Sequence, residues 1–219
     1  MTILLSNAGK RYNRDWIFRH LTYTFTSGNS YAIIGPNGSG KSTLLQAIGG
    51  AIALSEGTLS CEGDNSTSAV TPENLYQYIA IAAPYLEVIE EMTATEFLHF
   101  HQTFKPLLAG ISIKEIIAVI GLDNAANKQI RYYSSGMKQR VKLAQAIFSD
   151  VSVILLDEPC TNLDAVGIAL YQKLIHTYCN NKLVVVSSND EAEYGFCREK
   201  LSIPDFKNTA SSSTLARNQ

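Results

Sequence analysis

The fold of this chain is decided by the stretch Gly35-Pro36-Asn37-Gly38-Ser39-Gly40-Lys41-Ser42-Thr43. An apolar run precedes it at 31–34 and a helical pattern follows it at 44–48, which predicts the order strand, glycine-rich turn, helix. The spacing G-x-x-x-x-G-K-S/T is typical of a phosphate-binding loop, because glycines let successive backbone N–H groups point into one concavity and the helix N-terminus favours an anion. We expect every residue of the stretch to contact a nucleoside triphosphate, with Lys41 on the β- and γ-phosphates and the Ser42 hydroxyl on Mg²⁺. The alternative is a flexible turn that merely contains a lysine, and the flanking strand and helix argue against it.

Length and charge narrow the classes of function that remain. The chain has 219 residues, enough for one domain with a subdomain, and its net charge of −2 gives no electrostatic reason to expect a nucleic acid partner. No apolar run approaches the roughly 20 residues that cross a bilayer. We therefore expect that, if the protein works at a membrane, another chain provides the crossing. The four cysteines are widely spaced and predict buried thiols rather than a disulfide framework or a zinc site.

The pattern along the chain predicts an α/β fold: a parallel-sheet core interrupted by one helical insertion, with antiparallel strands near the N-terminus. The expected strands are 2–6, 20–26, 30–34, 58–61, 79–82, 151–156 and 182–187. The helical regions are 93–148, which begins with a capping box at Thr93-Ala94-Thr95-Glu96, and then 165–178 and 190–196. A polar surface loop is expected at 62–74 and a disordered tail at 207–219.

Two carboxylates stand at the end of the apolar strand that reads Val153-Ile154-Leu155-Leu156-Asp157-Glu158. Ligands of open parallel sheets bind beyond the carboxyl ends of the strands. We therefore expect Asp157 to meet the Mg²⁺ that Ser42 holds, and Glu158 to polarise an attacking water. Without the phosphate loop, the same pattern would indicate only a strand that meets solvent.

With these motifs in order, the chain resembles the ATP-binding subunit of ABC transporters. A variant of that family's signature motif reads Tyr133-Ser134-Ser135-Gly136-Met137-Lys138-Gln139-Arg140, and a D-loop reads Thr161-Asn162-Leu163-Asp164. The resemblance runs from Tyr12 to about Ile203. It implies a P-loop NTPase core with a parallel sheet, an antiparallel β subdomain and a helical insertion, as a single ABC ATPase domain over 1–219 with a helical subdomain at about 88–148.

The resemblance also implies a composite ATP site in a head-to-tail homodimer. Tyr12 would stack on adenine, with Trp16 as the competitor and packing on the core as the alternative. Ser134 and Gly136 would open a helix that faces the γ-phosphate held by a second protomer, whereas alone they read as a simple helix cap. ATP would then join the two chains, and hydrolysis would let them separate.

Two positions depart from the family pattern. The family's glutamine before the helical insertion is missing, because the region reads Ile81-Ala82-Ala83-Pro84-Tyr85-Leu86-Glu87. Asn189 stands where the family has its switch histidine. Asparagine donates a hydrogen bond but carries no charge, so we expect a catalytic set of Lys41, Glu158 and Asn189 with slow hydrolysis.

The favoured function is an ATPase subunit that powers a separately encoded integral-membrane permease, cytoplasmic and peripheral on the inner face of the cell membrane. The acidic surface of Pro84–Glu96 would receive a basic loop of that permease, or is only a solvated face. Two alternatives remain open: a pseudo-ATPase that binds ATP without useful turnover, and a soluble ATP-gated switch that grips a nucleic acid or ribosome.

Overall fold

A computed structural model describes residues 1–63, 70–71 and 73–207. Much of the predicted surface loop at 62–74 and all but the first residue of the predicted disordered tail at 207–219 lie outside the described residues.

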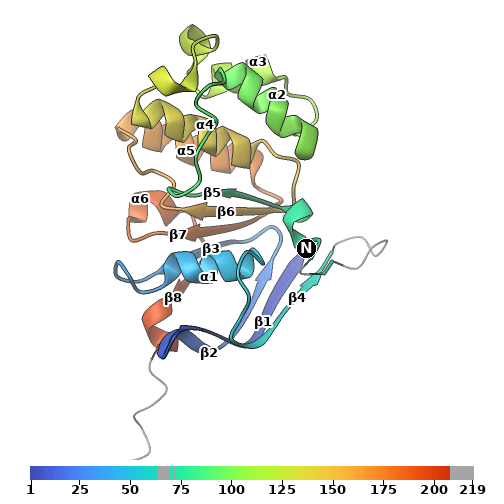
Figure 1. Cartoon of the computed structure of the whole chain (residues 1–219), viewed down its shortest axis with the longest axis vertical. Coiled ribbons are helices and arrows are strands. Elements are labelled where there is room, and N and C mark those ends of the chain that lie inside the picture. The colour runs from blue at the N-terminus through green and yellow to red at the C-terminus, as the bar shows by residue number, and fades with distance from the viewer. Residues whose placement is uncertain (64–69, 72, 208–219) are drawn as a thin grey trace, which may run out of the picture.

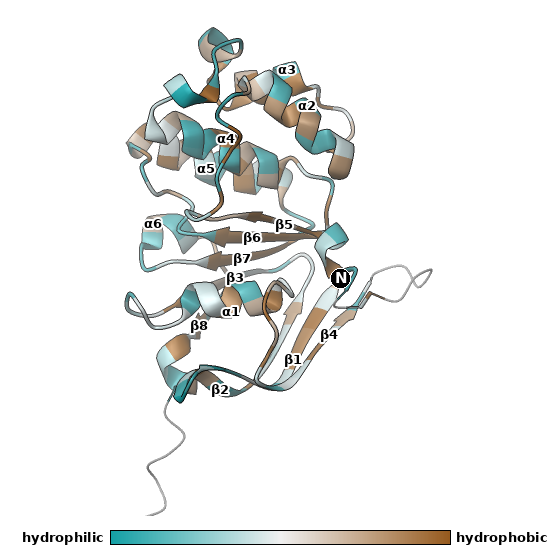
Figure 2. Cartoon of the chain, viewed as in Figure 1, coloured by the Kyte–Doolittle hydropathy of each residue, from teal (hydrophilic) through white to brown (hydrophobic). Residues whose placement is uncertain are grey.

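The centre of the molecule is a parallel sheet with the strand order β5-β6-β7-β3-β8 (Figure 1). Its strands are β3 (Ser30–Ile34), β5 (Ile79–Ala82), β6 (Val153–Asp157), β7 (Leu183–Ser187) and β8 (Glu199–Ser202). Every residue of β6 and β7 is buried, and Figure 2 shows both strands as hydrophobic along their length. Such continuous apolar runs are expected of strands covered on both faces. Strand β8 has no counterpart among the strands predicted from the sequence, because it forms through long-range pairing with β3.

A second, antiparallel sheet has the order β2-β1-β4 and consists of β1 (Thr2–Tyr12), β2 (Asp15–Thr26) and β4 (Glu56–Glu62). The predicted strands at 2–6 and 20–26 are correct in kind but too short. The register between β1 and β2 shifts several times after Leu5, and these bulges break the alternation of apolar and polar residues that marks a strand in the sequence.

Helices cover both faces of the central sheet. They are α1 (Lys41–Ile48), α2 (Ala94–Phe104), α3 (Ile113–Val119), α4 (Ser135–Ile147), α5 (Ala165–Tyr178) and α6 (Glu191–Tyr194). Short 3-10 turns lie at Leu75–Tyr78, Asp123–Ala125, Ile130–Tyr132 and Ile203–Phe206. The predicted capping box at the start of α2 is confirmed, because Thr93 and Glu96 each bond the other's backbone N–H.

The sheet divides the apolar interior into two cores. Along β6, Ile154 and Leu156 face the core shared with α2 to α5, whereas Val153 and Leu155 face the core shared with α1 and the antiparallel sheet. This alternation fixes which side of the sheet each helix occupies. Among the residues that the structure describes, no helix is both long and apolar enough to span a membrane.

Candidate nucleotide-binding site

The motif residues of the phosphate loop and the acidic strand lie at one edge of the central sheet. Strand β3 leads into the loop at 35–40 and then α1, while β6 and β7 end side by side with Asp157 opposite Ser187. These strands are parallel, so their carboxyl ends share the edge at which the loop before α1 is drawn, on the left of Figure 1. This carboxyl end of the strands is the place at which open parallel sheets bind ligands.

The phosphate loop is shaped for an anion by its backbone. Gly40 caps α1 with a φ of 108°, and a Cβ at that position would overlap the side chain of Ile17. No side chain caps the N-terminus of α1, which leaves its N–H groups and the positive end of the helix dipole open to a phosphate.

Lys41 is only 5% exposed and its ammonium lies folded across the loop. The Nζ donates to the carbonyl oxygen of Gly35 at 2.9 Å and to that of Pro36 at 3.4 Å. The buried hydroxyl of Ser39 has no hydrogen-bond partner among the described residues. The loop therefore holds a positive charge and an unsatisfied polar group at the place where phosphate oxygens would bind.

The residues predicted to hold Mg²⁺ have the chemistry that a hard cation prefers. Asp157 is 3% exposed, and its Oδ1 is buried with no hydrogen-bond partner among the residues that the structure describes. Leaving a buried carboxylate oxygen unsatisfied is costly, so this oxygen has the chemistry of a cation ligand. Ser42 lies in the first turn of α1, directly after Lys41, and its hydroxyl is an oxygen ligand of the kind that Mg²⁺ accepts.

Glu158 follows Asp157 with an exposed side chain and an unusual backbone. Its φ of 43° lies in the left-handed region, which costs about 1–3 kcal/mol for a residue other than glycine. The Glu158 N–H donates to the Ser187 carbonyl at 2.9 Å. The carboxylate is thereby held at the open edge of the sheet, as a group that acts on water requires.

Asn189 lies against the phosphate loop, although 152 residues separate it from its partner there. Its Nδ2 donates to the side-chain oxygen of Asn37 at 2.8 Å. The structure therefore places the neutral Asn189 amide beside the phosphate loop.

The hairpin between β1 and β2 carries the two candidate adenine-stacking rings. Tyr12 is 48% exposed, with the Lys10 ammonium 5.1 Å from its ring centroid. Trp16 is half-buried and has the Arg19 guanidinium 4.4 Å from its own centroid. Tyr12 is thus the more exposed of the two rings. The contact between Ile17 and Gly40 ties this hairpin to the phosphate loop, and sequence reasoning missed it because a lone isoleucine in a strand carries no signal.

The signature residues lie at the start of α4. The Ser134 side chain caps this helix by accepting from the Met137 N–H at 3.2 Å, and a Cβ on Gly136 would come within 2.9 Å of the Asn162 carbonyl oxygen. A hollow of about 380 Å³ lies over these residues and the D-loop. Within the described part of the chain, no hydrogen bond joins Ser134 or Gly136 to the phosphate loop.

Tyr85 lies within the stretch 81–87, which lacks the glutamine that the family resemblance leads one to expect. Burial raises the pKa of its hydroxyl, a polar contact with Gln46 lowers it, and the charge of Asp157 raises it again. The hydroxyl is therefore within electrostatic reach of the predicted metal ligand. Sequence reasoning missed it because an aromatic residue after proline has no metal-ligand signature.

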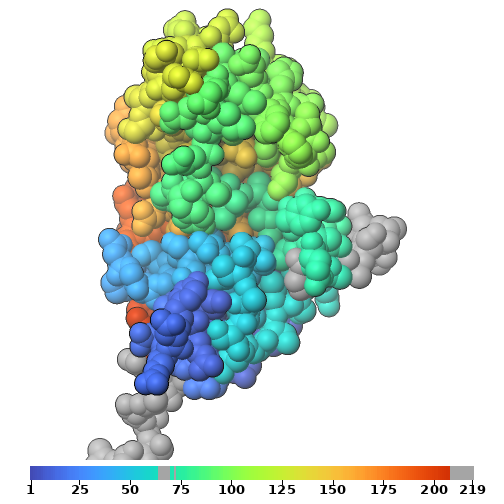
Figure 3. All heavy atoms as spheres, viewed as in Figure 1, coloured from blue at the N-terminus to red at the C-terminus, as the bar shows by residue number. Residues whose placement is uncertain are grey.

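The acidic surface after β5 is largely neutralised within the chain. Glu90 forms an ion pair with Lys138, and Glu91 lies 3.1 Å from Arg131. Figure 3 shows this segment, in green, between α1 and the helices of the insertion. The pairing removes the charge argument for a basic partner loop at Glu90 and Glu91.

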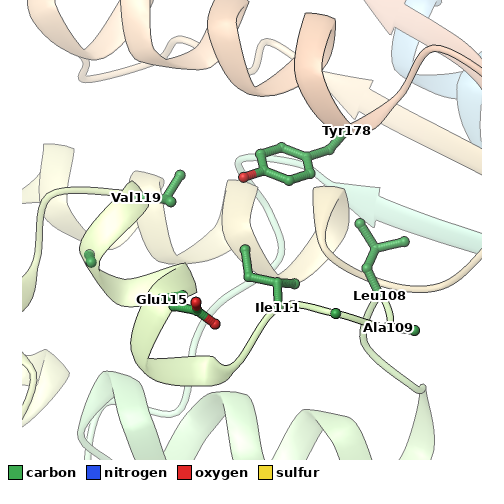
Figure 4. A pocket seen from close by; sticks show the side chains of 8 residues that line it. Leu108, Ala109, Ile111, Glu115, Val119 and Tyr178 are labelled. Atoms are coloured by element: carbon green, nitrogen blue, oxygen red, sulfur yellow. The ribbon is translucent and has the colours of Figure 1, made fainter.

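A second hollow, of about 440 Å³, lies between the helical insertion and the end of α5. It is lined by Leu108, Ile111, Val119 and Tyr178 (Figure 4). The Glu115 carboxylate at its rim is already bound to Ser112, which caps α3. Such an apolar lining has no chemistry for a phosphate.

Comparisons with known proteins agree with this geometry. The family model described as ABC transporter matches residues 18–161. The uncharacterized ABC transporter ATP-binding protein YybJ of Bacillus subtilis is 29% identical over 77% of this chain and 76% of its own length. The cytochrome c biogenesis ATP-binding export protein CcmA of Agrobacterium fabrum is 26% identical over 87% of this chain and 90% of its own.

Solved structures share the fold. A putative ABC transporter ATP-binding protein from Pyrococcus furiosus superposes with a TM-score of 0.79 at 20% identity, covering 95% of this chain and 100% of the other. The dimeric bacterial ABC transporter cassette MJ0796 superposes with a TM-score of 0.76 at 23% identity, covering 92% and 94%. The predicted fold class, a P-loop core with a parallel sheet, an antiparallel subdomain and a helical insertion, is confirmed. The chain belongs to the ABC transporter family and is an ATP-binding subunit of the ABC ATPase type.

Proposed function

We propose that this protein hydrolyses ATP slowly and uses ATP-driven, head-to-tail dimerisation to power a separately encoded membrane permease. The observation that carries the proposal is the buried, unpartnered Oδ1 of Asp157 at the sheet edge that also bears the phosphate loop. An orphaned carboxylate beside an open helix N-terminus suits the joint binding of a divalent cation and a polyphosphate.

Each residue of the site has a task in this proposal. The phosphate loop and Lys41 bind the β- and γ-phosphates, and Tyr12 stacks on the adenine. Ser42 and Asp157 would hold Mg²⁺, which would neutralise phosphate charge. Glu158 accepts a proton from the attacking water, and Asn189 donates a hydrogen bond to the γ-phosphate. Because a neutral donor is roughly half as strong as a charged one, turnover is slower than with a histidine at this position.

A second chain would contribute to the ATP site through its signature turn. Ser134 and Gly136 have no bonded link to the phosphate loop of their own chain among the described residues, and the N-terminus of α4 would meet the γ-phosphate bound to a partner protomer. The dimeric state of the structural relative MJ0796 supports this arrangement. The domain limits of the sequence analysis, one domain over 1–219 with a helical subdomain at about 88–148, belong to the same proposal.

Exposed aromatic residues support a permease docking surface on the helical insertion. The rings of Phe100 and Phe104 pack 5.1 Å apart on α2, and Phe104 remains 75% exposed. Tyr85 and Leu86, in the segment that follows β5, are exposed as well. Exposed apolar side chains that pack together, as these two phenylalanines do, are typical of a contact with another protein. This docking would place the protein on the cytoplasmic face of the membrane.

Turnover by the purified protein tests the enzymatic part. At saturating Mg·ATP we expect measurable phosphate release by the wild type, and none above background by the Glu158→Gln variant, which keeps its shape but loses the base. Glu191→Gln, an exposed carboxylate on α6, is the matched control and should hydrolyse normally. Normal turnover by Glu158→Gln would show that Glu158 is not the base. A wild type that binds ATP but never turns over would favour the pseudo-ATPase alternative.

Co-purification from membranes tests the transport part. The full chain should be recovered with a polytopic membrane protein, and Phe104→Glu should lose that partner while still binding ATP. Val119→Glu, an exposed apolar position on α3, is the control. Recovery with ribosomes or nucleic acid instead would favour the soluble switch.

A further inference from the structure

A single peptide group, the one between Pro159 and Cys160, is held on both sides by buried side chains from distant parts of the chain. The Gln139 Nε2 donates to the Pro159 carbonyl oxygen at 2.7 Å. On the other side, the Cys160 N–H donates to the Glu193 Oε1, also at 2.7 Å. We call Gln139 and Glu193 the peptide clamp.

Burying the polar side chains of both clamp residues costs free energy. This cost argues that their hydrogen bonds to the Pro159–Cys160 peptide, rather than packing, account for their position. Gln139 is 4% exposed and Glu193 is 5% exposed. A buried amide or carboxyl loses the hydrogen bonds of water, and short bonds to the backbone only partly replace them. Indeed the Glu193 Oε2 has no partner among the described residues, so packing alone would favour an apolar side chain there.

The clamp joins three segments that the proposed reaction uses. Gln139 lies on α4, one turn beyond the signature residues Ser134 and Gly136. Glu193 lies on α6, which begins two residues after Asn189, and the Tyr171 hydroxyl fixes this helix by donating to the Glu193 carbonyl at 2.8 Å. The clamped peptide begins at Pro159, the residue after Glu158. The signature helix, the Glu158 turn and the switch segment are therefore connected through one rigid amide plane.

The backbone of Glu158 needs such support. Its left-handed φ of 43° is strained, and strain of this kind persists only where the surroundings fix the chain. The Glu158 N–H is tied to Ser187, and the Thr161 N–H donates back to the Glu158 carbonyl at 3.1 Å. These bonds anchor the ends of the turn, whereas the clamp holds its middle.

We propose that Gln139 and Glu193 are positioning residues for ATP hydrolysis, which hold the Pro159–Cys160 peptide so that the Glu158 carboxylate points at the attacking water. This inference rests on the proposed function, in which Glu158 is the base. Neither residue needs to touch the nucleotide, because a small displacement of the base is enough to lose rate.

The charge of Glu193 is not what the clamp requires. Burial raises the pKa of its carboxyl, as do the charges of Asp190 and Glu158, while the nearby Ser188 hydroxyl and the hydrogen bond from the Cys160 N–H lower it. In either protonation state the Oε1 still accepts from the Cys160 N–H. A glutamine at this position keeps the acceptor, so Glu193→Gln is a conservative variant that should retain function.

The test compares kcat with KM in the purified full chain. Gln139→Met and Glu193→Leu remove one side of the clamp each at similar volume, and we expect kcat to fall about 10-fold or more through misplacement of the base. The KM and the Kd for Mg·ATP should stay within about twofold, since the phosphate loop is untouched. The double variant should lose little more than the worse single one, because both hold the same peptide.

Two controls make the outcome decisive. Gln172→Met removes a similar bond, from the Gln172 Nε2 to the Ala192 carbonyl at 2.8 Å, without reaching the clamped peptide, and it should keep its kcat. Glu193→Gln should restore what Glu193→Leu loses. If Glu193→Leu fails to fold, Glu193→Asp takes its place, with an acceptor one methylene too short and an intermediate loss of kcat.

An unchanged kcat in folded clamp variants would overturn the inference while leaving the role of Glu158 intact. A rise in KM and Kd that follows loss of thermal stability would overturn it as well, because a purely structural role predicts that pattern. Normal turnover by Glu158→Gln, measured in the same series, would instead overturn the proposed function and the inference together.

Discussion

The phosphate loop and the signature turn each place small residues at the start of a helix, yet their surroundings differ. The N-terminus of α1 has no side-chain cap, and Lys41 beside it is buried. The N-terminus of α4 is capped by its own Ser134, which is exposed together with Ser135. The phosphate loop thus leaves backbone N–H groups available to a phosphate bound by the same chain. The signature turn is instead capped by its own serine, and that serine is exposed to solvent. This difference suggests that one chain binds ATP by itself and needs a second chain to use it.

The largest expected effect comes from a substitution in the phosphate loop, which should bind ATP within one chain. Lys41→Ala removes the only charge that the loop offers to the phosphates, and charged hydrogen bonds are worth about 1.5–3 kcal/mol, so the affinity for Mg·ATP should fall about 10- to 100-fold. Turnover should fall by about two to three orders of magnitude, since the charge also stabilises the transition state. Calorimetry and phosphate release measure the two quantities.

The exposed Lys114→Ala on α3 is the matched control and should change neither quantity. Wild-type affinity in Lys41→Ala would show that the loop does not hold the phosphates.

The second expected effect comes from a substitution in the signature turn, which should lower turnover without changing ATP binding by the phosphate loop. Ser134→Asp keeps the cap of α4, because aspartate is as good a cap as serine, but it adds a negative charge where the partner's γ-phosphate would arrive. We expect kcat to fall about 10-fold or more from this repulsion, while the affinity of the monomer for ATP stays unchanged.

Ser134→Asn, which caps a helix about as well as aspartate but carries no charge, controls for any effect on helix stability and should lose less of the kcat. If Ser134→Asp reduced ATP binding by the monomer, the signature turn would belong to the ATP site of its own chain. The proposed difference between the phosphate loop and the signature turn would then be wrong.

The smallest effect sharpens the comparison at the switch position. Asn189→His supplies a donor that can carry charge, and since charge-assisted bonds are about twice as strong as neutral ones, turnover should rise several-fold. Phosphate release is measured from pH 6 to 8, about the range over which imidazole titrates. A rate at or below that of the wild type would show that the neutral amide does not limit hydrolysis.

Sequence reasoning succeeded where the information was local. Strand β5 and helix α5 were predicted with the bounds that the structure has, because proline or polar turns delimit each apolar pattern. The phosphate loop could be read directly, since its neighbours in the sequence are also its neighbours in space.

The contacts that could not be predicted join residues far apart. Gln139 meets the peptide after Pro159 across 20 residues, Cys160 meets Glu193 across 33, and Asn189 meets Asn37 across 152. No periodicity encodes such pairs, because they depend on how the sheet stacks its strands. Strand β8 was missed for the same reason: its four residues are extended by pairing with β3 rather than by their own pattern.

The most direct test of the composite site is sedimentation of the Glu158→Gln variant with and without Mg·ATP. Because this variant should retain ATP without hydrolysing it, we expect a monomer in buffer or with ADP and a dimer with Mg·ATP, and the dimer should disappear when Ser134→Asp is added. A variant that is saturated with ATP and remains monomeric at every protein concentration would contradict the account.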